Sequence, residues 1–168
     1  GTVRFDMPIT INNWRPRNYG GDYRGPVTLS EALAESLNTV AAQIGNEIGV
    51  DKVTALAHEF GVKSPLHNYP SITLGSDEVT LMDMTTGFGV LAKGGLQMNP
   101  YIIEEIRNSK GDLLYSNPVA AAPRIYPENL AADMNSMLSR VVVSGTGGAA
   151  RIPGWDVAGK TGTSQDWR

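Results

Sequence analysis

The sequence predicts a mixed α and β (α+β) fold built around one hydrophobic core. Four segments place apolar side chains at helical spacing, and two short segments rich in β-forming residues flank a Gly-containing turn. Nineteen Gly and ten Pro among 168 residues indicate many turns between these elements. A chain of this length can bury a core of its own, so we expect a single domain.

The first part of the chain predicts a short strand followed by a long loop and a helix. Phe5, Ile9 and Ile11 are spaced for a strand, and residues 12–25 are rich in Gly, Pro and Asn. Thr28 and Glu31 form the pattern of a capping box. The apolar spacing behind it predicts one continuous helix over residues 29–44.

The remaining elements follow from the same signals. Asp51 and Gly61 bound a predicted second helix, and Pro127 opens a predicted fourth helix. The predicted segments are a helix over 51–60, a loop over 63–77, a helix over 80–93, a hairpin of 101–107 with 113–115, a helix over 127–143, a Gly-rich turn over 144–150 and a strand over 155–162.

Composition excludes several classes of function. The net charge of -3 argues against a nucleic-acid partner, which usually needs a basic surface. The chain has no Cys, two His and no H-E-x-x-H pattern, so we expect neither a disulfide nor a metal site. No apolar run reaches the length of a membrane span, and no signal peptide is visible. The chain starts at Gly1 and stops just after a predicted strand, so we expect it to be part of a longer protein.

The predicted last strand carries the most informative residues, Lys160-Thr161-Gly162-Thr163. A lysine at a strand edge is often only a solubility device. Here Gly162 permits the close approach of a ligand backbone, and the two threonines supply hydroxyls on opposite faces of an extended chain. An ammonium beside a strand edge that can accept a peptide predicts a site for a carboxylate-bearing peptide.

Ser36 and Asn38 form a second candidate pair, inside the first predicted helix. Residues two apart on a helix do not share a face, so both can enter one cleft only if the helix ends or kinks there. A serine within a helix usually points to solvent or bonds to a backbone carbonyl. The pair gains a functional interpretation only together with the Lys160 segment.

Two other features have mainly structural interpretations. Residues 145–148, Gly-Thr-Gly-Gly, lack the lysine of a phosphate loop and follow a helix, which favours a simple turn. Trp14, Tyr19 and Tyr23 in the first loop fit equally well as the rim of a groove or as packing anchors.

Together these motifs resemble the transpeptidase domain of class A (bifunctional) penicillin-binding proteins, over nearly the whole chain. Serine enzymes that recognise penicillin carry the signatures S-x-x-K, S-x-N and K-[ST]-G. The second and third are present, and no Ser in the chain has a Lys three residues later. The matching segments are Trp14–Tyr19 (W-x-P-x-N-Y), Val27–Asn38 (V-T-L-x-x-A-L-x-x-S-x-N), Leu74–Gly95 (ending A-x-G-G) and Ala158–Asp166 (A-G-K-T-G-T-[ST]-x-D).

The resemblance implies a penicillin-binding protein transpeptidase (serine β-lactamase-like) fold, in which an antiparallel sheet is flanked by helices. Residues 1–168 would be part of a single transpeptidase domain, cut at both ends and lacking strands of the sheet. The implied reaction is D,D-transpeptidation, in which a serine attacks stem peptides ending in D-Ala-D-Ala and an amine from a second stem resolves the acyl-enzyme. The nucleophile is not in this chain.

The resemblance also implies roles for individual residues. Ser36 would relay a proton to the leaving amine, Asn38 would hold the missing lysine and contact the substrate amide, and Lys160 would orient Ser36. Thr161 and Thr163 would bind the substrate carboxylate beside Gly162, with the Thr163 N–H as half of an oxyanion hole.

The implied partners are peptidoglycan stem peptides and β-lactam antibiotics, with no cofactor and no nucleic acid. Family members also carry a glycosyltransferase domain and an anchor in the bacterial inner membrane, with the transpeptidase on the periplasmic side. We expect the chain alone to be inactive, and a companion fragment of the same domain is a further expected partner because open sheet edges are a liability.

Three alternatives remain from the sequence. A serine β-lactamase shares the motifs, although the chain lacks the E-x-x-L-N context of class A deacylation. A penicillin-binding sensor domain would keep the groove without turnover. If the chain had no link to this family, an α/β peptide-binding module using the Lys160 strand would remain.

Overall fold

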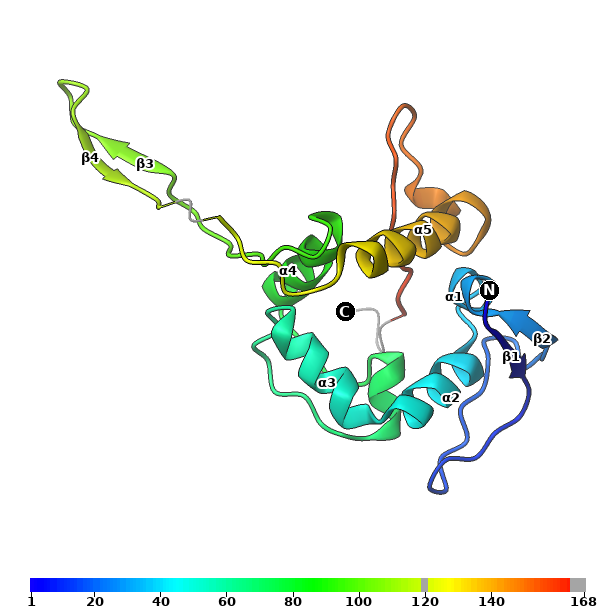
Figure 1. Ribbon diagram of the computed structural model, residues 1–168. Helices are drawn as coiled ribbons and strands as arrows, with labels where there is room; N and C mark the ends of the chain where they lie inside the picture. The colour runs from blue at the N-terminus through cyan, green and yellow to red at the C-terminus, as the bar shows by residue number, and fades with distance from the viewer. Residues whose placement is uncertain (119–120, 164–168) are drawn as a thin grey trace.

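A computed structural model of the chain describes residues 1–118 and 121–163. It confirms the mixed α and β fold, with five α-helices and two small antiparallel sheets in the described part (Figure 1). In chain order the elements are β1 (Val3–Asp6), β2 (Gly25–Thr28), α1 (Leu29–Ala34), α2 (Asn38–Ile48), α3 (Val50–Glu59), the 3-10 helix η1 (Pro70–Leu74), α4 (Leu81–Ala92), β3 (Glu105–Arg107), β4 (Leu113–Ser116), α5 (Glu128–Ser144) and the 3-10 helix η2 (Gly148–Ala150).

The two sheets are separate antiparallel pairs. In the first, β1 pairs with β2 so that Val3 lies opposite Thr28 and Asp6 opposite Gly25. The sequence did not predict β2, because its four residues include Gly25 and Pro26 and carry little strand signal. In the second, β3 and β4 form the predicted hairpin, with a register irregularity between Ile106 and Arg107.

The prediction of one helix over residues 29–44 is wrong. The chain leaves helical geometry after Ala34, and Ser36 takes a left-handed backbone conformation with φ of +56° before α2 begins at Asn38. The Leu37 N–H closes this break by donating to the carbonyl of Ala32 at 2.9 Å. Periodicity did not reveal the break because Leu37 is itself buried with Ala32 and Val40, so the apolar spacing runs through it.

The predicted strand over residues 155–162 is also absent. Within the described part of the chain, no other segment forms a ladder with these residues, and they are irregular. A strand exists only through hydrogen bonds to a neighbour, so β-forming composition alone is not sufficient. Similarly, Ile9 lies outside β1, and Ile11 forms only an isolated bridge with Trp14.

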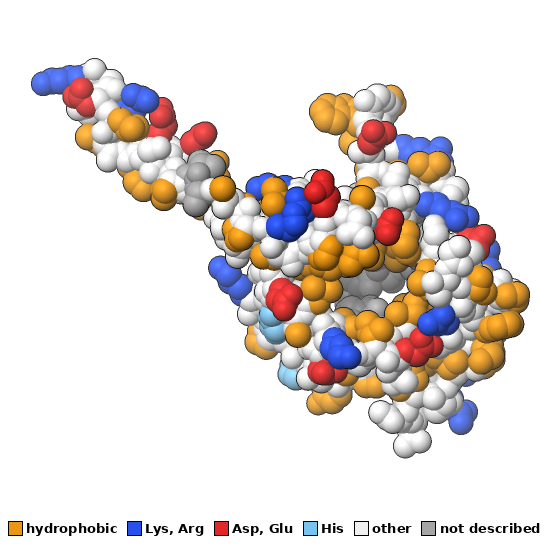
Figure 2. Space-filling view, viewed as in Figure 1, with side chains coloured by type: hydrophobic (Ala, Val, Ile, Leu, Met, Phe, Trp, Pro, Cys, Tyr) orange, Lys and Arg blue, Asp and Glu red, His pale blue; other side chains and the backbone are white. Residues whose placement is uncertain are grey.

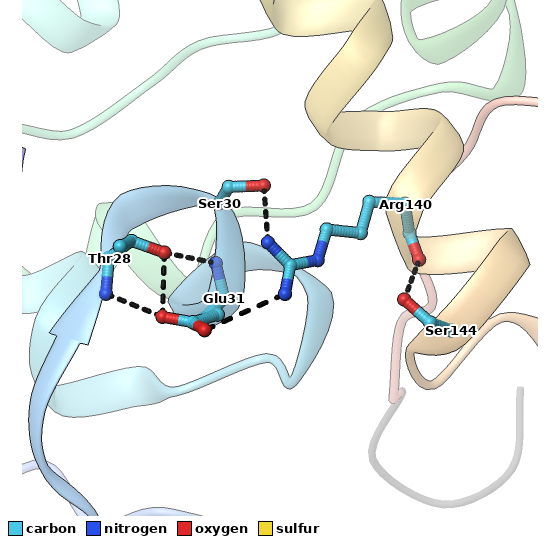
Figure 3. A network of polar contacts seen from close by, with 5 residues as sticks. All are labelled: Thr28, Ser30, Glu31, Arg140 and Ser144. Atoms are coloured by element: carbon cyan, nitrogen blue, oxygen red, sulfur yellow. Dashed lines mark hydrogen bonds and ion pairs between the residues drawn. The ribbon is translucent and has the colours of Figure 1, made fainter. Parts of the chain in front are cut away.

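The helices follow one another around the molecule, so that α5 returns to lie against α1 (Figure 1). The start of α1 is closed by the predicted capping box, in which Glu31 N–H donates to Thr28 Oγ1 at 3.2 Å and Thr28 N–H donates to Glu31 Oε2 at 2.8 Å. Arg140 of α5 reaches this cap, donating to Ser30 Oγ at 3.3 Å and pairing with Glu31 at 3.6 Å (Figure 3). These contacts fix the relative position of two helices that are distant in sequence.

The β3–β4 hairpin extends away from the helices (Figure 1). It carries apolar side chains along its length (Figure 2). Its exposed large apolar residues and those of the segment before it are Tyr101, Ile102, Ile103, Ile106, Leu113, Leu114 and Tyr115.

In the described residues, no helix combines the length and apolar character needed to cross a membrane.

A buried carboxylate joins the first sheet, the first loop and α2. Asp6 is 1% exposed and accepts hydrogen bonds from Asn18 Nδ2 at 2.8 Å, from the Arg24 N–H at 2.9 Å and from Thr39 Oγ1. Burial alone would raise the pKa of Asp6, but these donors and the charge of Arg24 outweigh burial and lower it. The carboxylate is therefore held ionised within the fold.

A second carboxylate, Asp83, joins the start of α4 to the chain after α3. It accepts from Ser64 Oγ at 2.6 Å, from the Lys63 N–H at 2.8 Å and from Thr80 Oγ1 at 2.8 Å. These hydrogen bonds, with Ser64 the strongest, lower the pKa of Asp83 well below its usual range.

We expect Thr39→Val to destabilise the protein by about 1–3 kcal/mol, because it leaves the buried Asp6 carboxylate without one of its donors. Urea denaturation measures the free energy of unfolding. The matched change Thr85→Val removes an exposed helical hydroxyl and should alter it by less than about 0.5 kcal/mol. Equal effects of the two changes would contradict a special role for the Asp6 cluster.

We expect stability to be lost as the pH falls below about 4, the ordinary pKa of an unfolded aspartate. The folded pKa of both Asp6 and Asp83 is lowered, so their contribution is complete above the unfolded pKa and disappears as the pH falls through the folded pKa. Asp83→Asn should lower the melting temperature at pH 7 and flatten its acid dependence. Asp133→Asn, on the exposed face of α5, should keep the wild-type slope; an unchanged slope in Asp83→Asn would contradict the assignment.

Candidate active site

The structure brings the two sequence motifs together. Lys160 Nζ donates to Ser36 Oγ at 2.8 Å, although the two residues lie 124 positions apart. The same ammonium donates to the Thr161 carbonyl at 3.0 Å and lies 3.3 Å from Thr161 Oγ1. Both Ser36 and Lys160 are half-buried, so the contact is at the edge of the molecule rather than in its core.

Ser36 reaches this contact because it occupies the break between α1 and α2. From the sequence we expected Ser36 and Asn38 to enter one cleft only if the helix ended or kinked at these residues. The left-handed conformation of Ser36 turns the chain between the two helices, with Glu35 at the end of α1 and Leu37 preceding α2. Leu37 is buried and anchors the turn to the core.

Lys160 is positioned by α5 and by the turn that follows it. The Gly159 N–H donates to the Leu138 carbonyl of α5 at 3.3 Å. Thr161 Oγ1 lies 2.6 Å from Thr146 Oγ1, in the Gly-rich turn after α5. Thr146 in turn donates through its N–H to the Ala34 carbonyl, at the end of α1, at 3.0 Å.

Thr146 is therefore a site residue that the sequence interpretation missed. Its segment is a turn, as predicted, but the turn connects the end of α1 to the Lys160 segment. Gly145 is required for this approach, because a side chain there would collide with the Ala34 carbonyl. The available signal was the pair of glycines around a single threonine, which marks a close backbone approach as well as a turn.

Burial lowers the pKa of the Lys160 ammonium. Among the described residues, no carboxylate forms an ion pair with Lys160. Ser36 Oγ accepts a hydrogen bond from Lys160 and still has its own proton to donate. The arrangement is chemically suited to moving a proton through the hydroxyl and to attracting an anionic ligand.

The other predicted site residues lie around this contact in different ways. Asn38 is the first residue of α2, and its Nδ2 donates to the Arg17 carbonyl at 2.8 Å instead of to Ser36 or Lys160. Gly162 and Thr163 are exposed, and the space beside the Gly162 Cα is open. The last motif residues, Ser164, Gln165 and Asp166, lie outside the described residues.

The aromatic residues of the first loop do not behave as one group. Tyr19 is 99% exposed, Trp14 is half-buried, and Tyr23 lines a surface groove with Arg15 and Arg17. Within the described chain, no three acidic or histidine side chains come together in a way that would hold a metal ion.

Comparison with known proteins agrees with this geometry. Residues 2–168 match the family described as the penicillin binding protein transpeptidase domain. The chain is 36% identical to penicillin-binding protein 1A of Neisseria lactamica, with 98% of this chain and 22% of that protein covered. It is 31% identical to penicillin-binding protein 1A of Rickettsia bellii, with 96% of this chain and 24% of that protein covered. The chain thus spans about a quarter of the length of these curated relatives.

Solved structures share the fold. The D,D-transpeptidase domain of a peptidoglycan glycosyltransferase from Eggerthella lenta superposes with a TM-score of 0.81 at 28% identity, covering 98% of this chain and 48% of that one. Penicillin-binding protein PonA1 from Mycobacterium tuberculosis gives a TM-score of 0.87 at 23% identity, with the same coverage of 98% and 48%, which supports the fold alone. The motifs, the fold and the family match together show that the chain belongs to the penicillin-binding protein transpeptidase domain family.

Proposed function

We propose that the protein containing this chain is a serine-type peptidoglycan D,D-transpeptidase of the class A penicillin-binding proteins. The observation that carries the proposal is the 2.8 Å hydrogen bond from Lys160 Nζ to Ser36 Oγ, which joins the K-T-G and S-x-N motifs in one site. Residues 1–168 form part of a single transpeptidase domain, and the S-x-x-K serine comes from a segment outside this chain.

In the proposed first step, the absent serine attacks the penultimate carbonyl of a stem peptide that ends in D-Ala-D-Ala. A covalent acyl-enzyme forms, and D-Ala leaves with a proton. The proton released by the attacking serine reaches the leaving amine through Ser36, whose Oγ accepts one proton and passes on its own while Lys160 orients the hydroxyl. An amine of a second stem peptide then attacks the acyl-enzyme and completes the cross-link.

The Lys160 segment binds the substrate in this mechanism. Its ammonium has no ion pair among the described residues and attracts the terminal carboxylate, which the hydroxyls of Thr161 and Thr163 also bind. The open space at Gly162 leaves room for the peptide backbone. The Thr163 N–H forms half of the oxyanion hole, with the nucleophile's own N–H as the other half.

The Asn38 side chain is the remaining element of the site. It contacts the substrate amide and the lysine of the absent S-x-x-K motif, while its bond to the Arg17 carbonyl fixes its orientation. The proposed partners are peptidoglycan stem peptides and β-lactams, which acylate the same serine. The proposed location is the outer side of the bacterial inner membrane, in a protein that also carries a glycosyltransferase domain.

We expect Ser36→Ala to slow acylation of the full-length protein by a fluorescent penicillin by about 100- to 10,000-fold, since it removes the proton relay. The measurement is the second-order rate of labelling. Ser109→Ala, at the exposed tip of the β3–β4 hairpin, serves as the control and should leave this rate unchanged. A full rate in Ser36→Ala would show that the hydroxyl beside Lys160 does not take part.

We expect the purified 168-residue chain to show no covalent labelling by fluorescent penicillin, because no Ser in it has a Lys three residues later. The measurement is fluorescence of the chain after denaturing electrophoresis. A segment carrying the S-x-x-K motif, added as a companion fragment, should become labelled only when this chain is present. Labelling of the chain alone would refute the proposal that its nucleophile lies elsewhere.

A further inference from the structure

The first loop presents two arginines on one side. Along Arg15-Pro16-Arg17-Asn18 the exposure alternates, with both arginines exposed and Pro16 and Asn18 buried. Alternate residues of an extended chain point to the same face. Both arginine side chains are therefore on the outer side of the loop.

These arginines line a groove with a volume of about 390 Å³. Tyr23, Pro8, Ile9 and Pro16 supply apolar walls beside the two charges. A concave surface with apolar walls and a few directed polar groups is the usual form of a ligand site. Planar guanidinium groups bind carboxylates through two parallel hydrogen bonds, which gives such a groove a preferred ligand.

The charges in the groove are not neutralised by the described residues. Of the four arginines in residues 1–24, Arg4 pairs with Glu47 at 2.7 Å and Arg24 pairs with Glu35 at 3.0 Å. Arg15 and Arg17 form no ion pair with any residue the structure describes. Two arginines without an ion pair in one groove, in a chain with a net charge of -3, indicate a place for an external anion.

The groove is held in place next to the candidate active site. Asn18 donates to Asp6 Oδ1 at 2.8 Å and to the Asp22 carbonyl at 3.1 Å, which closes the loop. Asn18 Oδ1 accepts from the Thr39 N–H at 3.3 Å, and the Arg17 carbonyl accepts from Asn38 at 2.8 Å. The loop is thus bound to the first turn of α2, two residues from Ser36.

We propose that this groove binds an extended peptide segment through carboxylates on alternate residues, which pair with Arg15 and Arg17. The inference rests on the proposed transpeptidase function, because the bound segment would belong to the same peptide-bearing polymer that reacts beside Lys160. The groove holds a part of the substrate away from the reacting bond. It therefore determines which peptide strands bind rather than the chemistry that they undergo.

The test is a calorimetric titration of the full-length protein with two peptides, N-acetyl-Glu-Ala-Glu-amide and its uncharged analogue N-acetyl-Gln-Ala-Gln-amide. The wild-type protein should bind the Glu peptide at least about tenfold more tightly, since charge-assisted hydrogen bonds carry the affinity. The double variant Arg15→Gln/Arg17→Gln should lose this preference. Lys52→Gln/Lys110→Gln makes the same change in net charge at exposed sites on α3 and the hairpin, and should retain it.

Equal affinity of the wild-type protein for the two peptides, or binding of neither, would overturn the proposal without requiring any variant to fold. A loss of preference in Lys52→Gln/Lys110→Gln as large as in the arginine variant would overturn it too, because net charge alone would then explain binding. Failure of the proposed transpeptidase function has a separate readout, the absence of penicillin labelling in the wild-type full-length protein. The two failures are therefore distinguishable.

Discussion

The packing of α5 against α1 is the contact on which the candidate site depends. Ser36 follows α1, and Lys160 is attached to α5 through the bond from Gly159 to Leu138, so the distance between the two motifs is set by how these helices meet. Arg140 fixes one end of the pair at the cap of α1 (Figure 3). Thr146 fixes the other end through its hydrogen bond to the Ala34 carbonyl. Rotation of α5 against α1 would separate Ser36 from Lys160 without changing either residue.

The buried Asp6 cluster supports the other side of the site. It joins β1 to Asn18 in the first loop and to Thr39 in α2, and so keeps the Arg17 carbonyl in position to hold Asn38. The break at residues 35–37 is thus supported from both directions, by α5 on the Ser36 side and by the first loop on the Asn38 side. Fixed surroundings of this kind orient polar groups before a ligand arrives, which is the property that catalysis by positioning requires.

Patterns in the sequence predicted the features that depend on residues close together in the chain. The predicted capping box at Thr28 places the start of α1 correctly, because a cap involves only residues three positions apart. The pairing of β1 with β2, the break at Ser36 and the role of Thr146 depend on contacts between distant segments, and no short pattern encodes them. The strand expected over residues 155–162 does not form for the same reason, because a strand needs hydrogen bonds to a neighbouring segment. The motifs predicted Ser36 and Lys160 as site residues. Only the fold shows that Thr146 connects the end of α1 to the Lys160 segment.

The backbone at Ser36 carries a consequence for how this position can vary. Its φ of +56° lies in the region where glycine or asparagine is comfortable and where a serine costs about 1 kcal/mol. Selection for stability alone would therefore favour glycine at this position, because Ser36→Gly relieves the backbone strain and raises the free energy of unfolding. Under the proposed function the Ser36 hydroxyl relays a proton, so the turn and the proposed chemistry favour different residues at this position. In relatives that carry glycine at this position, we expect a more stable fold and a less reactive site.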